Sequence, residues 1–213
     1  MAENESSRTP WIVFTMYSPY MAVNLGDFKN SKGENLEAAP VVSLCRCGQS
    51  SRMPYCDGTH SKIGFVGEKE PGREPDRTVE YEGKDITILY NRGVCAANGA
   101  CVKGLPDVFK DEEPWRPDST SASEIIRTIE KCPSGALSYK VGGTRYERSD
   151  RSPAVKVAKN GPLEVVGGIV LHDDKGNTPE CREHYTLCRC GGSDNRPFCD
   201  GTHLENDFRD DEN

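Results

Sequence analysis

The apolar positions of the chain fall in short runs that are separated by turns containing glycine or proline. Such runs at residues 11–15 and 155–158 predict strands. Each is followed by a turn with a proline, a second strand, a glycine turn, and a short strand at residues 41–44 or 184–187. The pattern therefore predicts two small β-rich units with the same order of elements.

The segment between these units has a different pattern. Residues 78–81 and 85–90 predict a β-hairpin that turns at residues 82–84. Residues 121–131 predict a helix in which Ser121 is the N-cap and a glutamate follows three residues later. Three isoleucines form the stripe that this helix is expected to bury: Ile125, Ile126 and Ile129. The whole pattern indicates the α+β class, with a small insert between two β-rich units.

The last strand of each β-rich unit leads into nearly the same sixteen residues. Residues 45–60 read CRCGQSSRMPYCDGTH, and residues 188–203 read CRCGGSDNRPFCDGTH. The register between the copies continues without a gap through the flanking residues, as far as Phe65 and Phe208. A lone motif could arise by chance, but a shared register of this length could not. The two units are therefore copies of one module.

Composition favours small cores. Only 35% of the 213 residues are hydrophobic, and metal sites are a common substitute for a large core. The net charge of −7, without a basic stripe, argues against a nucleic-acid partner. No apolar stretch approaches the roughly 20 residues of a membrane span, and the amino terminus resembles neither a secretion signal nor a transit peptide. We therefore expect a cytoplasmic protein with no membrane partner and with solvated acidic tails at residues 1–6 and 205–213.

Each copy of the motif offers three cysteines and one histidine in a C-x-C-x8-C-x3-H pattern. Without a secretion signal the thiols are expected to be reduced, and clustered reduced cysteines usually bind metal. The last cysteine and the histidine are four residues apart, which predicts that they share one face of a helical turn. The candidate ligands are Cys45, Cys47, Cys56 and His60 in the first copy and Cys188, Cys190, Cys199 and His203 in the second.

Two kinds of metal centre fit this donor set. Zinc accepts three cysteines and one histidine in a tetrahedral site, and an iron–sulfur cluster accepts the same residue types. The C-x-C spacing is tighter than the usual zinc knuckle, and it favours two ligands on the same iron of a [2Fe–2S] cluster. Zinc remains the alternative.

Both copies resemble the CDGSH iron–sulfur domain, the family of mitoNEET, with threonine at Thr59 and Thr202 where the family name has serine. Beyond the ligands, the resemblance includes Ser50, Pro54, Asp57 and Gly58, and also Ser193, Pro197, Asp200 and Gly201. It implies one [2Fe–2S] cluster in each of two modules, at residues 10–70 and 150–209. It also implies that a two-cluster dimer is folded into one chain, with its modules related by a pseudo-two-fold axis, so a monomer is expected.

Three cysteines of the insert form a third candidate site: Cys95, Cys101 and Cys132. With the segments GLPDVF and CPSGAL, they resemble the divergent mono-cluster branch of bacterial-type ferredoxins, which implies a ferredoxin-like domain at residues 75–145. Asn98 stands where a further cysteine is usual, and Ala97 stands where some members have histidine. Three thiolates favour a [3Fe–4S] cluster. A [4Fe–4S] cluster with Asn98 or an outside ligand is an alternative, as is a decayed site with buried thiols.

Other residues carry less specific signals. Cys181 has no cysteine counterpart in the first copy, so it is either a spare thiol or a redox-active one. Arg46 and Arg189 lie between ligand cysteines, where they would offset cluster charge, bond to a thiolate, or simply be solvated. Trp11 and Trp115 are expected to anchor cores.

The sequence thus predicts an iron–sulfur protein with three clusters that acts in electron transfer with a redox protein partner. No dinucleotide-binding glycine motif, P-loop or nucleophile triad is present, so we do not expect an enzyme. The alternative is a cluster store, a cluster donor to an apo-acceptor, or a redox or pH sensor that works through labile histidine ligation. A zinc-stabilised scaffold is a third hypothesis.

Overall fold

A computed structural model describes residues 9–110, 114–147 and 150–213 of the chain. The described residues form three four-stranded sheets. The first sheet has the order β11-β1-β2-β4, with bounds Val170–Asp173, Trp11–Phe14, Tyr20–Val23 and Val41–Leu44. The second has the order β12-β10-β9-β3, with bounds His184–Leu187, Leu163–Val166, Ala154–Val157 and Phe28–Lys29.

These two sheets exchange one strand with each other. Strand β11 belongs to the second copy of the repeat but pairs in parallel with β1 of the first copy. In return, β3 of the first copy pairs in parallel with β9 of the second. The remaining pairs within both sheets are antiparallel. Each sheet is therefore completed by a strand from the other copy.

The insert forms the third sheet and carries the longest helix. Its order is β5-β6-β7-β8, with bounds Thr78–Glu82, Thr87–Asn91, Leu137–Val141 and Thr144–Tyr146. Its helices are α2 (Ala100–Gly104) and α3 (Ala122–Ile129), and its 3₁₀ turns are η1 (Arg92–Val94) and η2 (Pro117–Ser119). The predicted hairpin is confirmed as β5 and β6, which pair in antiparallel register.

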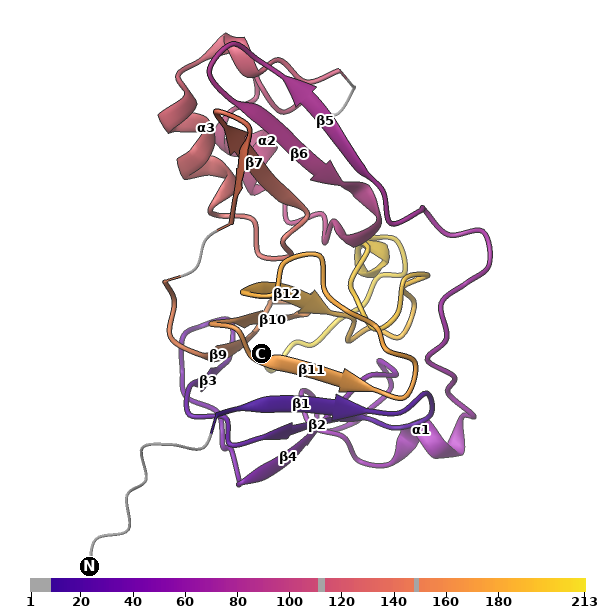
Figure 1. The fold of residues 1–213 in the computed structure, drawn as a ribbon. Coiled ribbons are helices and arrows are strands. Elements are labelled where there is room, and N and C mark those ends of the chain that lie inside the picture. The colour runs from indigo at the N-terminus through magenta and orange to yellow at the C-terminus, as the bar shows by residue number, and fades with distance from the viewer. Residues whose placement is uncertain (1–8, 111–113, 148–149) are drawn as a thin grey trace, which may run out of the picture.

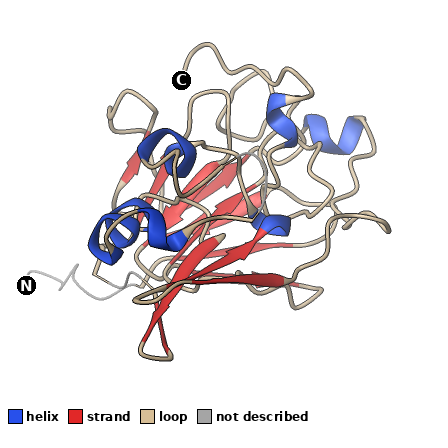
Figure 2. Ribbon diagram, turned by 90° about the horizontal axis from the view of Figure 1, so that it is seen from above, coloured by secondary structure: helices blue, strands red, loops and turns tan. Residues whose placement is uncertain are grey.

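The three sheets lie in a row. In Figure 1 the insert lies at the top, the sheet containing β12 and β10 lies in the middle, and the sheet containing β1 and β2 lies at the bottom. Seen from above in Figure 2, much of the chain is loop between short strands. Within the described part of the chain, no helix has the length and apolar character that a bilayer crossing requires.

An aromatic cluster forms the core of the insert. Trp115 is 8% exposed, and its ring centroid lies 4.5 Å from that of Tyr90, 4.9 Å from that of Tyr81 and 5.1 Å from that of Phe109. Trp115 is therefore a core anchor as predicted. Trp11 is not, because it is 37% exposed and lies at the start of β1.

Helix α3 begins where the sequence predicts, but its cap differs in detail. Ser121 is the N-cap residue, yet its side chain makes no capping bond to the backbone. Its hydroxyl instead donates to a carboxylate oxygen of Glu124 at 3.0 Å, and the hydroxyl of Thr120 donates to the same carboxylate. Ile125 and Ile129 are buried as predicted, whereas Ile126 is only half-buried.

The carboxyl-terminal tail is not simply solvated. Asp210 and Asn213 are each 6% exposed. Asn213 accepts a hydrogen bond from the Ser31 amide at 2.9 Å, and its side-chain amide donates to the Ala158 carbonyl at 3.1 Å. The expectation of a free acidic tail is therefore wrong for these residues. The matching expectation for residues 1–6 lies outside the described residues.

Candidate metal centres

The first two cysteines of each motif follow directly from a strand. Strands β4 and β12 end at the residue before Cys45 and Cys188. The Sγ atoms of Cys45 and Cys47 are 3.9 Å apart, and those of Cys188 and Cys190 are 3.7 Å apart. Two sulfurs bound at about 2.3 Å to one tetrahedral metal lie roughly 3.8 Å apart. Each C-x-C pair is thus spaced as two ligands of a single metal atom.

The third cysteine and the histidine of each motif also converge. Cys56 Sγ lies 3.2 Å from His60 Nδ1, and Cys199 Sγ lies 3.4 Å from His203 Nδ1. A sulfur and a nitrogen on one tetrahedral metal lie roughly 3.5 Å apart. Each motif therefore brings its four candidate ligands into two close pairs, the C-x-C cysteines and the cysteine with the histidine.

The local structure that achieves this differs from the predicted helical turn. Helix α1 (Thr59–Lys62) carries His60 but begins after Cys56, and the second copy has only a 3₁₀ turn, η3 (Thr202–Leu204). Gly58 and Gly201 precede these turns with φ of 87° and 98°. These left-handed conformations, which glycine adopts without strain, turn the histidine back toward the cysteine.

The aspartate and serine of the motif hold the ligand loop together. Asp57 accepts hydrogen bonds from the amide and hydroxyl of Ser51 at 2.9 Å each and from the Thr59 amide at 3.0 Å. These bonds keep the pKa of the Asp57 carboxyl well below its usual range. The Ser50 hydroxyl donates to the Tyr55 carbonyl at 2.6 Å. Neither role was found from the sequence, although the same serine and aspartate recur in the second copy.

The two arginines between ligand cysteines are structural. Arg46 and Arg189 are 2% and 1% exposed, so neither is solvated. The guanidinium of Arg46 donates to the carbonyls of Thr15 at 2.7 Å and Gly67 at 3.2 Å. That of Arg189 pairs with the buried carboxylate of Asp210. Each arginine fastens the ligand loop to chain segments around it.

In each C-x-C pair, one thiol loses its proton more easily than the other. In each pair the thiol–thiol hydrogen bond lowers the pKa of one cysteine, Cys45 or Cys190, to about 6. It raises the pKa of the partner thiol, as does burial. Because metal ligands must be thiolates, the lowered pKa of one cysteine in each pair favours metal binding near neutral pH.

The two quartets differ in their exposure to solvent. Cys199 and His203 are 2% and 7% exposed, whereas Cys56 and His60 are only half-buried. Burial lowers the pKa of His203, with a further contribution from the charge of Arg189. The second quartet is therefore the better shielded of the two.

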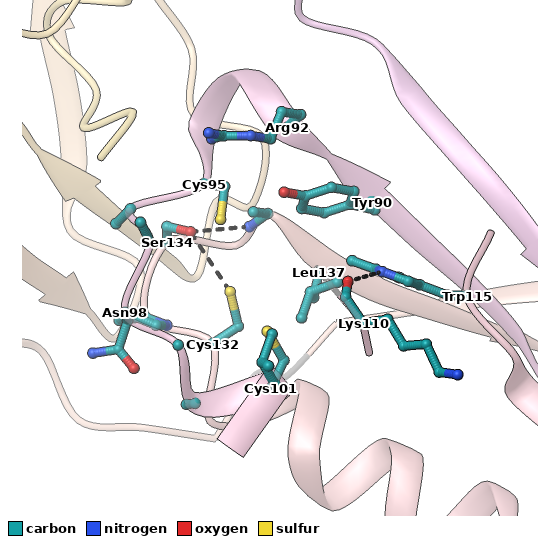
Figure 3. A pocket seen from close by; sticks show the side chains of 17 residues that line it. Tyr90, Arg92, Cys95, Asn98, Cys101, Lys110, Trp115, Cys132, Ser134 and Leu137 are labelled. Carbon is teal, nitrogen blue, oxygen red and sulfur yellow. Dashed lines mark hydrogen bonds between the residues drawn. The ribbon is translucent and has the colours of Figure 1, made fainter. Parts of the chain in front are cut away.

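The cysteines of the insert line one cavity of about 330 Å³. Cys95 follows η1, Cys101 lies in α2, and Cys132 follows α3, and all three are half-buried. Figure 3 shows their sulfur atoms facing the same space. Three thiolate donors around a cavity of this size fit the chemistry of an iron–sulfur cluster.

Asn98 lies at the rim of this cavity. Its side chain is exposed, and in Figure 3 its amide faces away from the three sulfur atoms. Residues that the sequence analysis does not single out complete the lining, among them Tyr90 and Ser134. The hydroxyl oxygen of Ser134 lies 3.5 Å from Cys132 Sγ. Burial, together with the charge of nearby Cys95, raises the pKa of the Tyr90 phenol.

The ligand loops of the two quartets touch each other. A β-carbon added at Gly48 would lie 2.2 Å from the carbonyl oxygen of Cys190. One added at Gly191 would lie 2.5 Å from the carbonyl oxygen of Cys47. Both glycines also have positive φ, 74° and 75°. Only glycine permits this close and reciprocal approach of the two C-x-C loops.

The loop of the third site touches the second quartet. A β-carbon added at Gly201 would lie 2.9 Å from Cβ of Ala97 and 3.6 Å from the carbonyl oxygen of Cys95. The side-chain amide of Asn195 donates to the Gly93 carbonyl at 2.7 Å. In Figure 1 the yellow turn η3 accordingly lies just below the end of β6. The loops of the second quartet thus contact the loops of both other sites.

Comparison with known families agrees with this geometry. The family described as "Iron-binding zinc finger CDGSH type" matches residues 18–61 and 160–204. The family described as "Divergent 4Fe-4S mono-cluster" matches residues 81–142, between the two. The chain belongs to the CDGSH iron-binding family. In this chain, two CDGSH modules flank a divergent mono-cluster iron–sulfur domain.

Two curated proteins are similar to part of this chain. The uncharacterized protein YjdI of Escherichia coli K12 is 36% identical over 62 residues, which cover 28% of this chain and 82% of YjdI. YjdI of Escherichia coli O157:H7 matches to the same extent. No solved structure matches the chain significantly.

Proposed function

We propose that this CDGSH protein is an electron carrier that holds two [2Fe–2S] clusters and one further cluster, most simply [3Fe–4S]. The quartet of Cys45, Cys47, Cys56 and His60 would hold the first, and its counterpart in the second module would hold the second. Cys95, Cys101 and Cys132 would hold the third. When bound, such clusters supply reversible one-electron chemistry.

The contact between the loops that carry the donor sets is the observation that carries this proposal. Gly48 and Gly191 bring the two CDGSH ligand loops together, and Gly201 meets the loop of Cys95. A cluster store or a sensor needs each site to reach solvent or an acceptor, but it does not need the sites to touch. A relay of electrons does need its centres to lie close together, and the loop contacts favour a path from the first donor set through the second to the third.

The residues around the quartets serve this role by fixing the ligands. The buried guanidiniums of Arg46 and Arg189 hold the C-x-C loops. Asp57 ties the loop to the start of α1. A neutral imidazole in place of a thiolate leaves the site less negative, which favours a higher potential than an all-cysteine site would have.

We propose a [3Fe–4S] cluster in the insert because Asn98 faces away from the three sulfurs. The name of the matching family gives a [4Fe–4S] cluster as the alternative. Iron and sulfide analysis separates the two, with about seven iron atoms per chain in the first case and about eight in the second. Asn98→Ala should leave the iron content unchanged, whereas Cys101→Ala should remove the third cluster.

The second candidate function is cluster donation. His60 and Cys56 are only half-buried, so the first module is open enough to release its cluster to an apo-acceptor. We propose a monomer that meets either a redox protein or such an acceptor, and we do not propose an enzymatic activity.

A redox-cycling experiment decides between the two functions. The holoprotein is reduced and reoxidised repeatedly in the presence of an apo-ferredoxin, and its visible absorption and EPR spectra are recorded. An electron carrier keeps its full spectrum through the cycles and leaves the acceptor colourless. Loss of [2Fe–2S] absorption, matched by its gain in the acceptor, would favour donation instead.

A further inference from the structure

A fourth set of metal-binding side chains lies outside the three sites described above. Cys181, Glu183 and His184 offer a sulfur, a carboxylate oxygen and a ring nitrogen that all lie within 4.8 Å of one another. Cys181 and His184 are 2% and 4% exposed, and the side chain of Glu183 is 12% exposed. The set is thus largely buried, unlike a chance cluster of surface acids.

The sulfur of Cys181 and a carboxylate oxygen of Glu183 both lie next to Nδ1 of the His184 ring. Nδ1 of His184 lies 3.2 Å from Cys181 Sγ and 2.8 Å from a carboxylate oxygen of Glu183. Nδ1 carries either one proton or one lone pair, so it cannot bond well to both neighbours. Nε2 on the other side of the ring is buried without a hydrogen-bond partner among the described residues. The contacts at Nδ1 therefore orient the ring.

A small cation bound by all three side chains would remove the competition of the sulfur and the carboxylate for Nδ1. Sulfur, nitrogen and oxygen ligands of one tetrahedral zinc ion lie roughly 3.3–3.6 Å apart. The separations of Sγ and Oε2 from Nδ1 are a few tenths of an ångström shorter, so rotations of the side chains are sufficient to admit an ion. Cysteine with histidine is a donor set that zinc prefers to magnesium or calcium.

The surroundings hold the carboxylate in place. Arg151 donates through Nε to Glu183 at 3.0 Å and forms a second contact through Nη2, and the Gly167 amide donates at 3.1 Å. Such outer contacts typically orient metal ligands. Because Arg151 offsets the charge of Glu183, the Cys181 thiolate would be the main anionic ligand, which again suits zinc. Glu147 adds a second carboxylate next to Cys181.

The set belongs to the second module and lies against the insert. Gly135 belongs to the insert, directly after the Cys132 loop, and a β-carbon there would lie 2.5 Å from Cβ of Cys181. The set therefore lies where the second module meets the insert. The equivalent residues of the first module are Ala38, Pro40 and Val41, none of which binds metal.

We propose that Cys181, Glu183 and His184 bind a zinc-class divalent cation where the second CDGSH module packs against the insert. This assignment does not depend on what the iron–sulfur clusters do. All three ligands come from one short, largely buried segment of the second module, and they leave the fourth position of a tetrahedral ion open. Cation binding releases the thiol proton of Cys181.

Zinc analysis of the full chain tests the proposal. The cluster-loaded protein is equilibrated with Zn²⁺ and freed of excess ion, and then its zinc and iron contents and its zinc-edge X-ray absorption are measured. We expect one zinc per chain with a single sulfur ligand at about 2.3 Å and lighter ligands at about 2.0 Å. No retained zinc would overturn the proposal. Zinc with three sulfur ligands would overturn it as well, because the ion would then occupy an empty cluster site.

Matched variants locate the ion. Cys181→Ser and His184→Gln should each weaken zinc binding by more than the about 10- to 100-fold that loss of an outer contact costs, while iron content stays the same. His172→Gln, on the exposed side of β11, is the control and should retain zinc. Should Cys181→Ser fail to fold, Glu183→Gln replaces it. Full zinc retention in both His184→Gln and the cysteine or glutamate variant would contradict the assignment.

Discussion

At the scale of single residues, the two histidines make the CDGSH modules unequal. Both rings present Nδ1 to a cysteine sulfur, at 3.2 Å for His60 and 3.4 Å for His203. His203 is buried, whereas His60 is half-exposed. A proton from solvent therefore reaches the first ring more readily, although the two ligand sets are identical.

This difference in exposure predicts that acid removes the two clusters in two steps. The lowered pKa of His203 keeps its ring neutral, and so able to bind metal, to a lower pH than an ordinary histidine. On acidification the first module should therefore lose its cluster before the second, and loss of visible absorption with falling pH should be biphasic. In His60→Cys the early phase should disappear, and in His203→Cys the late phase should move to lower pH. A single phase that neither substitution alters would contradict the prediction.

Residue chemistry could be predicted from the sequence in part. The ligand quartets could be found because cysteine and histidine at fixed spacing have few other uses. The outward position of Asn98 could not, since spacing alone does not say which way a loop side chain faces. Nor could the burial of Arg46 and Arg189, because their acceptors are mostly backbone carbonyls, which no sequence pattern reveals.

At the scale of elements, the carboxyl-terminal tail is tied to the second ligand loop. Asp210 pairs with Arg189, and the two side chains are 3% and 0% exposed. Among the described residues Arg46 forms no such ion pair, and its guanidinium instead lies 4.4 Å from the centroid of the Phe14 ring. The tail thus neutralises a charge that would otherwise be buried alone in the second module.

Removal of this carboxylate should be costly. Breaking a buried ion pair by changing one partner typically costs about 3–5 kcal/mol. Asp210→Asn should therefore lower the melting temperature of the holoprotein by on the order of 10 °C, followed by circular dichroism. Asp207→Asn removes an 84%-exposed carboxylate of the same tail and should have little effect. Equal melting temperatures for the two variants would show that the pair contributes nothing.

The individual strands could be predicted, but their partners could not. Alternating apolar residues define a strand, and they do not specify which other strand lies beside it. The pairing of β3 with β9 and of β11 with β1 crosses from one copy to the other and therefore depends on the whole chain. The insert was easier to predict, because its hairpin and helix involve neighbours in sequence.

The exchange predicts how an isolated module behaves. A fragment of residues 1–72 keeps β1 and β3 but loses β9 and β11, so the edge of β1 has no partner within the fragment. We expect two fragments to pair reciprocally, with β3 of each beside β1 of the other. Light scattering with size-exclusion chromatography should report a dimer, whereas the full chain should elute as a monomer. A folded, monomeric fragment would contradict this prediction.

At the scale of the whole molecule, the second CDGSH module occupies the middle of the arrangement. Its sheet lies between the first module and the insert in Figure 1. Its ligand loops contact Cys47 on one side and Ala97 on the other. Electrons that move between the first and third sites would therefore pass through the second.

This arrangement predicts that loss of the middle cluster isolates the other two. Cys199→Ser should remove the second cluster and slow equilibration of electrons between the first and third centres, because the loops of the second module contact those of both other sites. Rapid-freeze EPR after substoichiometric reduction measures this rate. The matched variant Cys56→Ser removes the first cluster and should leave exchange between the second and third centres fast. Unchanged equilibration in Cys199→Ser would exclude a relay through the middle module.

The reciprocal exchange of β3 and β11 also determines how the protein responds to dilution. When two separate chains exchange strands, the assembled state weakens as concentration falls, by mass action. Here both partners lie on one polypeptide, so their association is intramolecular and has the same strength at any concentration. Because both halves belong to one polypeptide, their sequences need not be identical. The second half accordingly carries two features of its own, the ion pair between Asp210 and Arg189 and the contact of Cys181 with the insert.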